Sequence, residues 1–238
     1  MRINYTRKII ITLFLWKSIF PTSLNLTGIA RNDAQNYLQP ALEIITAQQT
    51  PLMPLASFTN SPLLGVGASL LSGAAPGFAS AEFGYPNFWF VLSVSSNLII
   101  GAHFTGVHWL DDNIHTVGPF VTTGWGTPEK SINAGFHFHN LKGPDDFHLT
   151  DVALDVSRVF RNTKWSWGYG VTAHFLKTAF HVTDNQDMDQ NYKMTTDINI
   201  IFTRLCVYRI LWKNVGVGSE IFLKPDNIVT TMNISINL

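Results

Sequence analysis

The last dozen residues alternate between apolar and polar side chains, and this period of two constrains the fold more than any other feature of the sequence. One set of alternate residues is mostly apolar: Ile228, Thr230, Met232, Ile234, Ile236 and Leu238. The set between them is mostly polar: Val229, Thr231, Asn233, Ser235 and Asn237. Successive side chains of a β-strand point to opposite faces, so the pattern predicts a strand with one apolar face.

Similar segments, 9 to 19 residues long, fill the chain from about residue 76. Ten candidate strands follow one another at 77–85, 87–95, 97–109, 114–125, 131–140, 147–160, 164–181, 193–211, 214–224 and 227–238. Most of the connections contain Pro, Gly, Asn or Asp, which hairpin turns require. The pattern predicts an all-β, antiparallel, up-and-down barrel of about ten strands. Eight strands are the alternative if an early hairpin is not part of the wall.

Composition narrows the class of protein. Charged residues make up 13% of the chain, about half of the roughly 25% typical of soluble domains. The 46% hydrophobic content excludes disorder, and the balance of 16 basic and 16 acidic residues argues against nucleic-acid binding. The single Cys206 excludes a disulfide framework and a multi-cysteine metal site.

Residues 1–30 read as a secretory signal. Basic residues precede the short apolar run IIITLFLW at 9–16, and small residues at 28 and 30 provide a cleavage site. An uncleaved N-terminal anchor is the alternative. Residues 31–75 form an extension, with apolar residues that include Leu42 at helical spacing. We expect a packed N-terminal extension; a periplasmic lead-in, a plug inside the barrel and an extra strand around 65–75 are the alternatives.

Alternation alone does not decide whether the apolar face points outward, as in a membrane barrel, or inward, as in a soluble β-sandwich or lipocalin-like barrel. Small neutral residues on the polar face favour the membrane barrel, as do aromatic residues near strand ends, where interface girdles lie. The predicted girdle comprises Tyr85, Trp109, Trp125, Trp165, Tyr192, Tyr208 and Trp212.

The signal, the hairpin pattern and the final strand NIVTTMNISINL resemble those of bacterial outer-membrane β-barrel proteins over residues 76–238. Members of that class most often end on an aromatic residue, whereas this chain has Leu238. The resemblance implies a small barrel in the bacterial outer membrane. It also implies outer-membrane lipids and the barrel-assembly machinery as partners.

The polar face of the strands defines the contents of the lumen. The predicted lumen network comprises His103, His137, His139, Asp155, His174, Asp197, Asn199 and Glu220. Side chains usually fill a barrel of eight to ten strands, and buried charges must be paired. We therefore expect a filled polar lumen without a cofactor, in a protein with a structural or interaction role.

Three alternatives give the lumen a chemical or transport function. His137 and His139 lie on one face of a strand and, with His103 or His174, can bind zinc or copper, although a lone HxH pattern is a weak signal. Ser157, His174 and Asp197 are an imaginable catalytic set for an enzyme acting on lipid A or peptides. A narrow channel for small solutes requires open space beside five glycines, Gly135, Gly168, Gly170, Gly216 and Gly218.

Overall fold

The computed structural model describes residues 39, 42–43, 46–47, 63–68, 86–109, 112–142, 147–182, 191–212, 215–225 and 227–237. Within these ranges the chain forms ten strands: β1 (Leu63–Ala68), β2 (Pro86–Ser95), β3 (Leu98–Trp109), β4 (Asp112–Thr127), β5 (Lys130–Lys142), β6 (Phe147–Arg161), β7 (Trp165–Val182), β8 (Tyr192–Trp212), β9 (Val215–Lys224) and β10 (Asn227–Asn237). No helix in the described part of the chain has the length and apolar character needed to cross a membrane.

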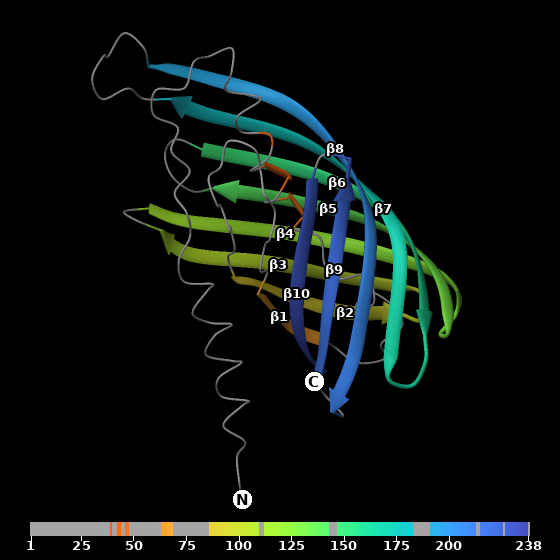
Figure 1. The fold of residues 1–238 in the computed structure, drawn as a ribbon. Helices are drawn as coiled ribbons and strands as arrows, with labels where there is room; N and C mark the ends of the chain where they lie inside the picture. The colour runs from red at the N-terminus through yellow and green to blue at the C-terminus, as the bar shows by residue number, and fades with distance from the viewer. Residues whose placement is uncertain are drawn as a thin grey trace, which may run out of the picture.

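The ten strands form one closed antiparallel barrel in which each strand pairs with its neighbours in sequence, and β1 closes the ring against β10. This confirms the up-and-down barrel that the alternation predicts, and Figure 1 shows the strands following one another around the wall. At what we call the turn end, short connections at 96–97, 128–129 and 162–164 join the strands. The opposite end is the loop end, where β7 ends and β8 begins.

The strands are strongly tilted because their pairing is staggered. The stagger is found by following paired residues around the barrel from strand to strand. From Val66 of β1, the successive partners on β2, β3, β4, β5, β6 and β7 lead to Asp197 of β8. In the other direction, the partners on β10 and β9 lead to Arg209 of β8, twelve positions further along the strand. With a rise of about 3.3 Å per residue and a strand spacing of about 4.8 Å, this stagger gives a tilt of about 40°.

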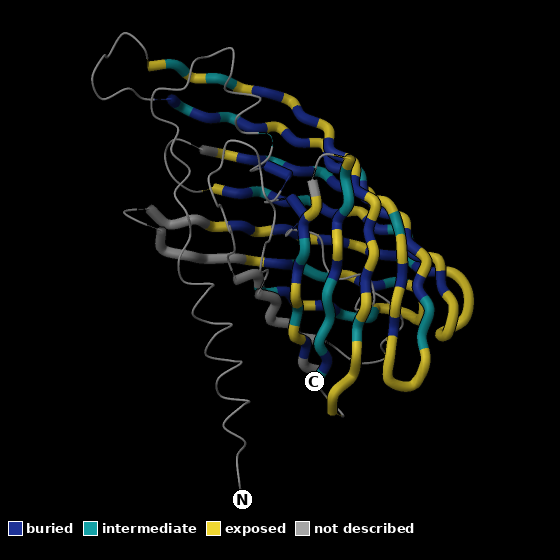
Figure 2. The backbone as a smooth tube through the Cα atoms, in the orientation of Figure 1, coloured by how far each residue is buried: buried dark blue, intermediate teal, exposed yellow. Residues whose placement is uncertain are grey.

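Apolar side chains cover the outside of the wall and polar side chains occupy much of the inside, and Figure 2 shows the resulting alternation of exposed and buried residues along each strand. Large exposed apolar residues lie on nine strands and include Phe90, Ile100, Val121, Phe136, Val156, Phe175, Leu205, Ile221 and Ile234. Buried polar residues include the histidines of β3, β5 and β7 that were predicted to face the lumen. The barrel therefore has the radial polarity of a membrane protein.

The outer surface changes character toward the loop end. β8 has 21 residues, and at the tilt above it covers about 50 Å along the barrel axis, whereas an apolar membrane band is about 25 Å tall. Its outward residues are mostly apolar from Ile201 to Trp212 and polar from Lys193 to Asn199. The part of the wall at the level of Lys193 to Asn199, which we call the tall wall, therefore extends beyond the apolar band.

The predicted facing of Asp197 and Asn199 is wrong. Both side chains are exposed on the outside, and Asp197 is paired with exposed Lys177 of β7. Their neighbours Ile198 and Ile200 are buried inside instead. In the tall wall, polar residues point outward and apolar residues inward, as in a water-soluble sheet, so the facing rule that holds inside the apolar band is reversed there.

The first strand also differs from the predicted order. β1 lies at 63–68, within the range assigned to the extension, and it overlaps the stretch for which an extra strand was one interpretation. The candidate strand at 77–85 lies outside the described residues. β1 reads LLGVGA, and with glycine at alternate positions it has no polar face for a pattern search to detect.

Three of the predicted girdle residues, Trp125, Trp165 and Trp212, are exposed near the turn end, together with Trp167. Tyr208 does not belong to the girdle, because it is half-buried with its hydroxyl 2.7 Å from Oγ of Ser235. It shares the inward face of β8 with other buried side chains at even positions. Tyr192 is half-buried at the start of β8, whereas Tyr85 and the side chain of Trp109 lie outside the described residues.

Candidate functional site

Three histidines meet inside the barrel. His103 of β3 and His137 and His139 of β5 are each no more than 2% exposed, and one ring nitrogen from each lies within 4.8 Å of the others. The rings of His103 and His139 pack edge to face with centroids 4.3 Å apart, and those of His137 and His139 stack at 6.2 Å. Among the described residues, this His cluster is the one group with spacing suited to a metal ion.

Gly118 of β4 explains how histidines from two non-adjacent strands touch. β4 lies between β3 and β5, so the two backbones are about 10 Å apart. Gly118 pairs with His103, and a Cβ atom at this glycine would lie 2.2 Å from Nδ1 of His139. The missing side chain therefore leaves the space into which the His139 ring leans.

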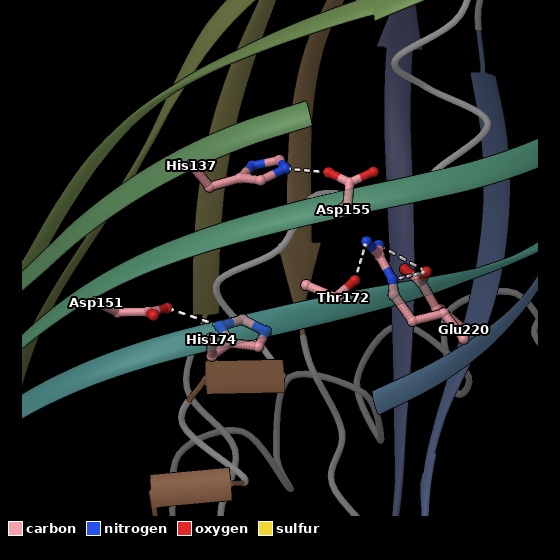
Figure 3. Close-up of polar contacts among 7 residues, drawn as sticks. His137, Asp151, Asp155, Thr172, His174 and Glu220 are labelled. Carbon is pink, nitrogen blue, oxygen red and sulfur yellow. Dashed lines mark hydrogen bonds and ion pairs between the residues drawn. The ribbon is translucent and has the colours of Figure 1, made fainter. Parts of the chain in front are cut away.

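The carboxylate of Asp155 contacts His137 from the neighbouring strand. Oδ1 of Asp155 and Nε2 of His137 form a buried hydrogen bond, which Figure 3 shows across β5 and β6. A Cβ atom at Gly135 would lie 2.2 Å from Oδ1 of Asp155, so this glycine also leaves room for the pair. A carboxylate is an acceptor only, so in the neutral imidazole this bond places the proton on Nε2 and leaves a lone pair on Nδ1.

A second pair, His174 and Asp151, is completely buried, with Nδ1 and Oδ2 2.8 Å apart (Figure 3). The imagined set of Ser157, His174 and Asp197 does not form, because Asp197 faces outward and Asp151 is the acid beside His174. Nε2 of His174 has no hydrogen-bond partner among the described residues. The nucleophile contact that a Ser-His-Asp relay requires is therefore missing at this histidine.

Glu220 is paired with a residue that the sequence analysis missed. Arg204 of β8 donates from Nε to Oε1 of Glu220 at 2.8 Å and from Nη1 to Oγ1 of Thr172 at 2.9 Å (Figure 3). Its guanidinium also lies 5.1 Å from the ring centroid of Phe222. Arg204 and Glu220 are both 1% exposed. Arg204 lies two residues after the buried Phe202 and so on the same face of β8. The sequence would have indicated Arg204 if the facing of β8 had been assigned correctly.

Residues from the N-terminal region lie against the inner wall. Glu43 forms an ion pair with Lys224, which shares the inward face of β9 with buried Glu220. Leu42, Thr46 and Ala47 are completely buried, and Oγ1 of Thr46 donates to the carbonyl oxygen of Leu42 at 2.8 Å, as on a helical turn. These contacts place Glu43 beside the inward face of β9.

Four of the five glycines expected to line a channel have neighbouring atoms close to where a Cβ atom would lie. A Cβ atom at Gly170 would lie 2.7 Å from Cβ of Ser157, and one at Gly216 would lie 1.8 Å from the hydroxyl of Tyr208. At Gly168 the same atom would lie 2.7 Å from the carbonyl oxygen of Arg158. At Gly135, likewise, a neighbouring carboxylate oxygen lies where a side chain would begin.

Comparison with known proteins concerns the fold alone. No protein-family model and no curated protein matches the sequence. The outer-membrane protease OmpT from Escherichia coli aligns with a TM-score of 0.47 and 8% identity, over 79% of this chain and 99% of that chain. The KdgM porin aligns with a TM-score of 0.40 and 7% identity, over 74% of this chain and 99% of that chain.

A loop-deletion mutant of OmpT, an outer-membrane protein of Vibrio cholerae, aligns with a TM-score of 0.35 and 9% identity. The alignment covers 64% of this chain, which spans about half (53%) of that longer chain. All three TM-scores lie below 0.5, so the fold of this chain rests on its own strand pairing. At these identities no functional residue is carried from one protein to another.

Proposed function

We propose that this chain is an integral barrel of the bacterial outer membrane, closed by its own residues, that serves as a rigid scaffold for interactions at the cell surface. The observation that carries the proposal is the ion pair between Glu43 and the inward-facing Lys224. It holds Glu43, next to the completely buried Leu42, at the inward face of β9, where an open pore would need water.

The outer surface supports a membrane location. Exposed aliphatic and aromatic residues surround the wall, and such a belt is costly in water but stable against lipid tails. Exposed tryptophans gather near the turn end, and Arg209 lies 4.7 Å from the ring centroid of Trp165. Basic side chains and the aromatic side chains Trp and Tyr favour the membrane interface. Outer-membrane lipids are therefore the proposed partners of this surface.

The tall wall supports the interaction role. Antiparallel membrane barrels place short turns in the periplasm and longer connections outside the cell, so the loop end faces outward in this proposal. Lys193, Asp197 and Asn199 are exposed there. The tall wall thus presents a paired, polar sheet surface above the membrane, which is suited to contact with other molecules.

The location is tested by heat modifiability. The chain is expressed with its signal, outer membranes are isolated, and boiled and unboiled samples are compared on SDS gels. We expect the unboiled protein to migrate differently because a closed barrel resists SDS. A soluble periplasmic protein without a shift would overturn the membrane location.

The closed lumen is tested by conductance of the purified barrel in planar bilayers. Wild type is expected to show no steps. Glu43→Lys places two positive charges together at Lys224 and is expected to release the segment and give fluctuating openings. The charge swap Glu43→Lys with Lys224→Glu is the matched control and is expected to be silent again. Steady steps in wild type, or silence in the single variant, would contradict the role of this ion pair.

A further inference from the structure

We infer that His103, His137 and His139 bind one divalent transition-metal ion inside the barrel, with Zn²⁺ as the ion that best suits the three imidazoles. This site is independent of the scaffold role proposed above. It requires nothing from the outer surface or from the segment around Glu43.

The first argument is the spacing of the ligand atoms. One nitrogen from each ring lies within 4.8 Å of the other two. Around a tetrahedral Zn²⁺ ion with Zn–N bonds of about 2.0–2.1 Å, ligand nitrogens lie about 3.4 Å apart. Each pair of nitrogens therefore has to approach by about 1.4 Å at most to reach the spacing of a tetrahedral site.

The second argument is the unsatisfied state of the rings. Both nitrogens of His103, both nitrogens of His139 and Nδ1 of His137 are buried without a hydrogen-bond partner among the described residues. Buried polar atoms are nearly always satisfied in native proteins, and each exception calls for an explanation such as an ion. A metal ion at the centre of the cluster satisfies one nitrogen of each ring.

The third argument is the carboxylate behind His137. Metal-binding histidines usually donate their second ring N–H to a carboxylate or a carbonyl, which fixes the tautomer and strengthens the ligand. Asp155 holds Nε2 of His137 in this way. The nitrogen that the carboxylate leaves open, Nδ1, is the one without a partner in this structure.

The surroundings favour a borderline transition metal over Ca²⁺ or Mg²⁺. Hard cations prefer oxygen ligands, whereas three neutral imidazoles suit Zn²⁺, Cu²⁺ or Ni²⁺. Phe120 lies beside the cluster, with its ring centroid 5.5 Å from that of His103 and 5.6 Å from that of His137. With three protein ligands, the ion keeps one coordination position open for water or another small ligand.

The test uses the full-length barrel folded in detergent, treated with a chelator, dialysed, and loaded with Zn²⁺ or Co²⁺. We expect one equivalent of bound Zn²⁺ by elemental analysis and the visible absorption of tetrahedral Co²⁺ with nitrogen ligands. His103→Gln and His139→Gln are expected to lose stoichiometric binding. Asp155→Asn, which keeps the acceptor but removes the charge, is expected to weaken binding about 10- to 100-fold.

Two control variants separate this site from other histidines. His174→Gln changes a buried histidine outside the cluster, and His115→Gln changes an exposed one; both are expected to bind one equivalent. Heat modifiability reports whether each variant is folded. The inference is overturned if wild type retains no metal after dialysis, or if Co²⁺ in the wild-type barrel lacks nitrogen-ligand absorption. Equal binding by folded His103→Gln would overturn it as well.

Discussion

The buried pair of Arg204 and Glu220 gives the sharpest quantitative prediction. Both side chains are 1% exposed, and Glu220 accepts from Arg204 at 2.8 Å and 2.7 Å through a single oxygen. Its other oxygen, Oε2, already lacks a partner among the described residues. Removing one member of a buried ion pair leaves the other charge poorly compensated and costs about 3–5 kcal/mol, whereas replacing both with apolar residues is often neutral.

We therefore expect Arg204→Met and Glu220→Leu each to lower the free energy of unfolding by about 3–5 kcal/mol, and the double variant to recover most of that loss. The measurement is urea unfolding of the barrel in phospholipid vesicles, followed by tryptophan fluorescence. Thr172→Val is a useful control because it removes only the hydroxyl that Arg204 contacts at 2.9 Å, for a cost of about 1 kcal/mol. The reasoning is refuted if each single variant costs less than about 1 kcal/mol, or if the two losses simply add.

Three further predictions address packing, facing and the membrane. Gly135→Ala places a Cβ atom 2.2 Å from Oδ1 of Asp155 and is expected to cost about 1–3 kcal/mol in the same unfolding assay; an unchanged stability would contradict the close packing there. In intact cells, a cysteine at Asp197 is expected to react with an impermeant maleimide while one at Ile198 stays protected, and the reverse result would restore the facing that the sequence suggested. Val156→Arg is expected to cost about 2–4 kcal/mol in vesicles if this exposed residue lies near the middle of the bilayer, whereas a cost near zero would remove β6 from the lipid-facing wall.

Most of the wall follows from the sequence because strand alternation and turn chemistry act over short distances. In β5, for example, Ile132 and Phe136 point outward while Asn133 and His137 point inward, as the alternation predicts. The hairpin turns at 96–97 and 128–129 separate strands within two residues of their predicted limits. Long-range pairing was required only to find β1, whose place depends on β2 and β10 rather than on its own pattern.

The candidate site was harder to predict because facing depends on height along the barrel. In β8 the apolar set changes from the inner face to the outer face between the tall wall and the apolar band. The rule that polar residues face the lumen therefore misplaced Asp197 and overlooked Arg204. The contact between His103 and His139 depends on Gly118 of the strand between them, and no spacing within a single strand reveals a contact across two strand widths.

The short first strand has a mechanical consequence. Within the described residues, β1 pairs with both of its neighbours over six residues, whereas β2 and β9 each have ten residues. The strand that is held by the fewest paired residues should separate first on heating, so we expect the barrel to open at β1. When β1 separates, β2 and β10 become unpaired edge strands, and such edges can pair with a strand of another chain. We therefore expect a peptide of suitable alternation to add to the barrel beside β1 before it adds anywhere else.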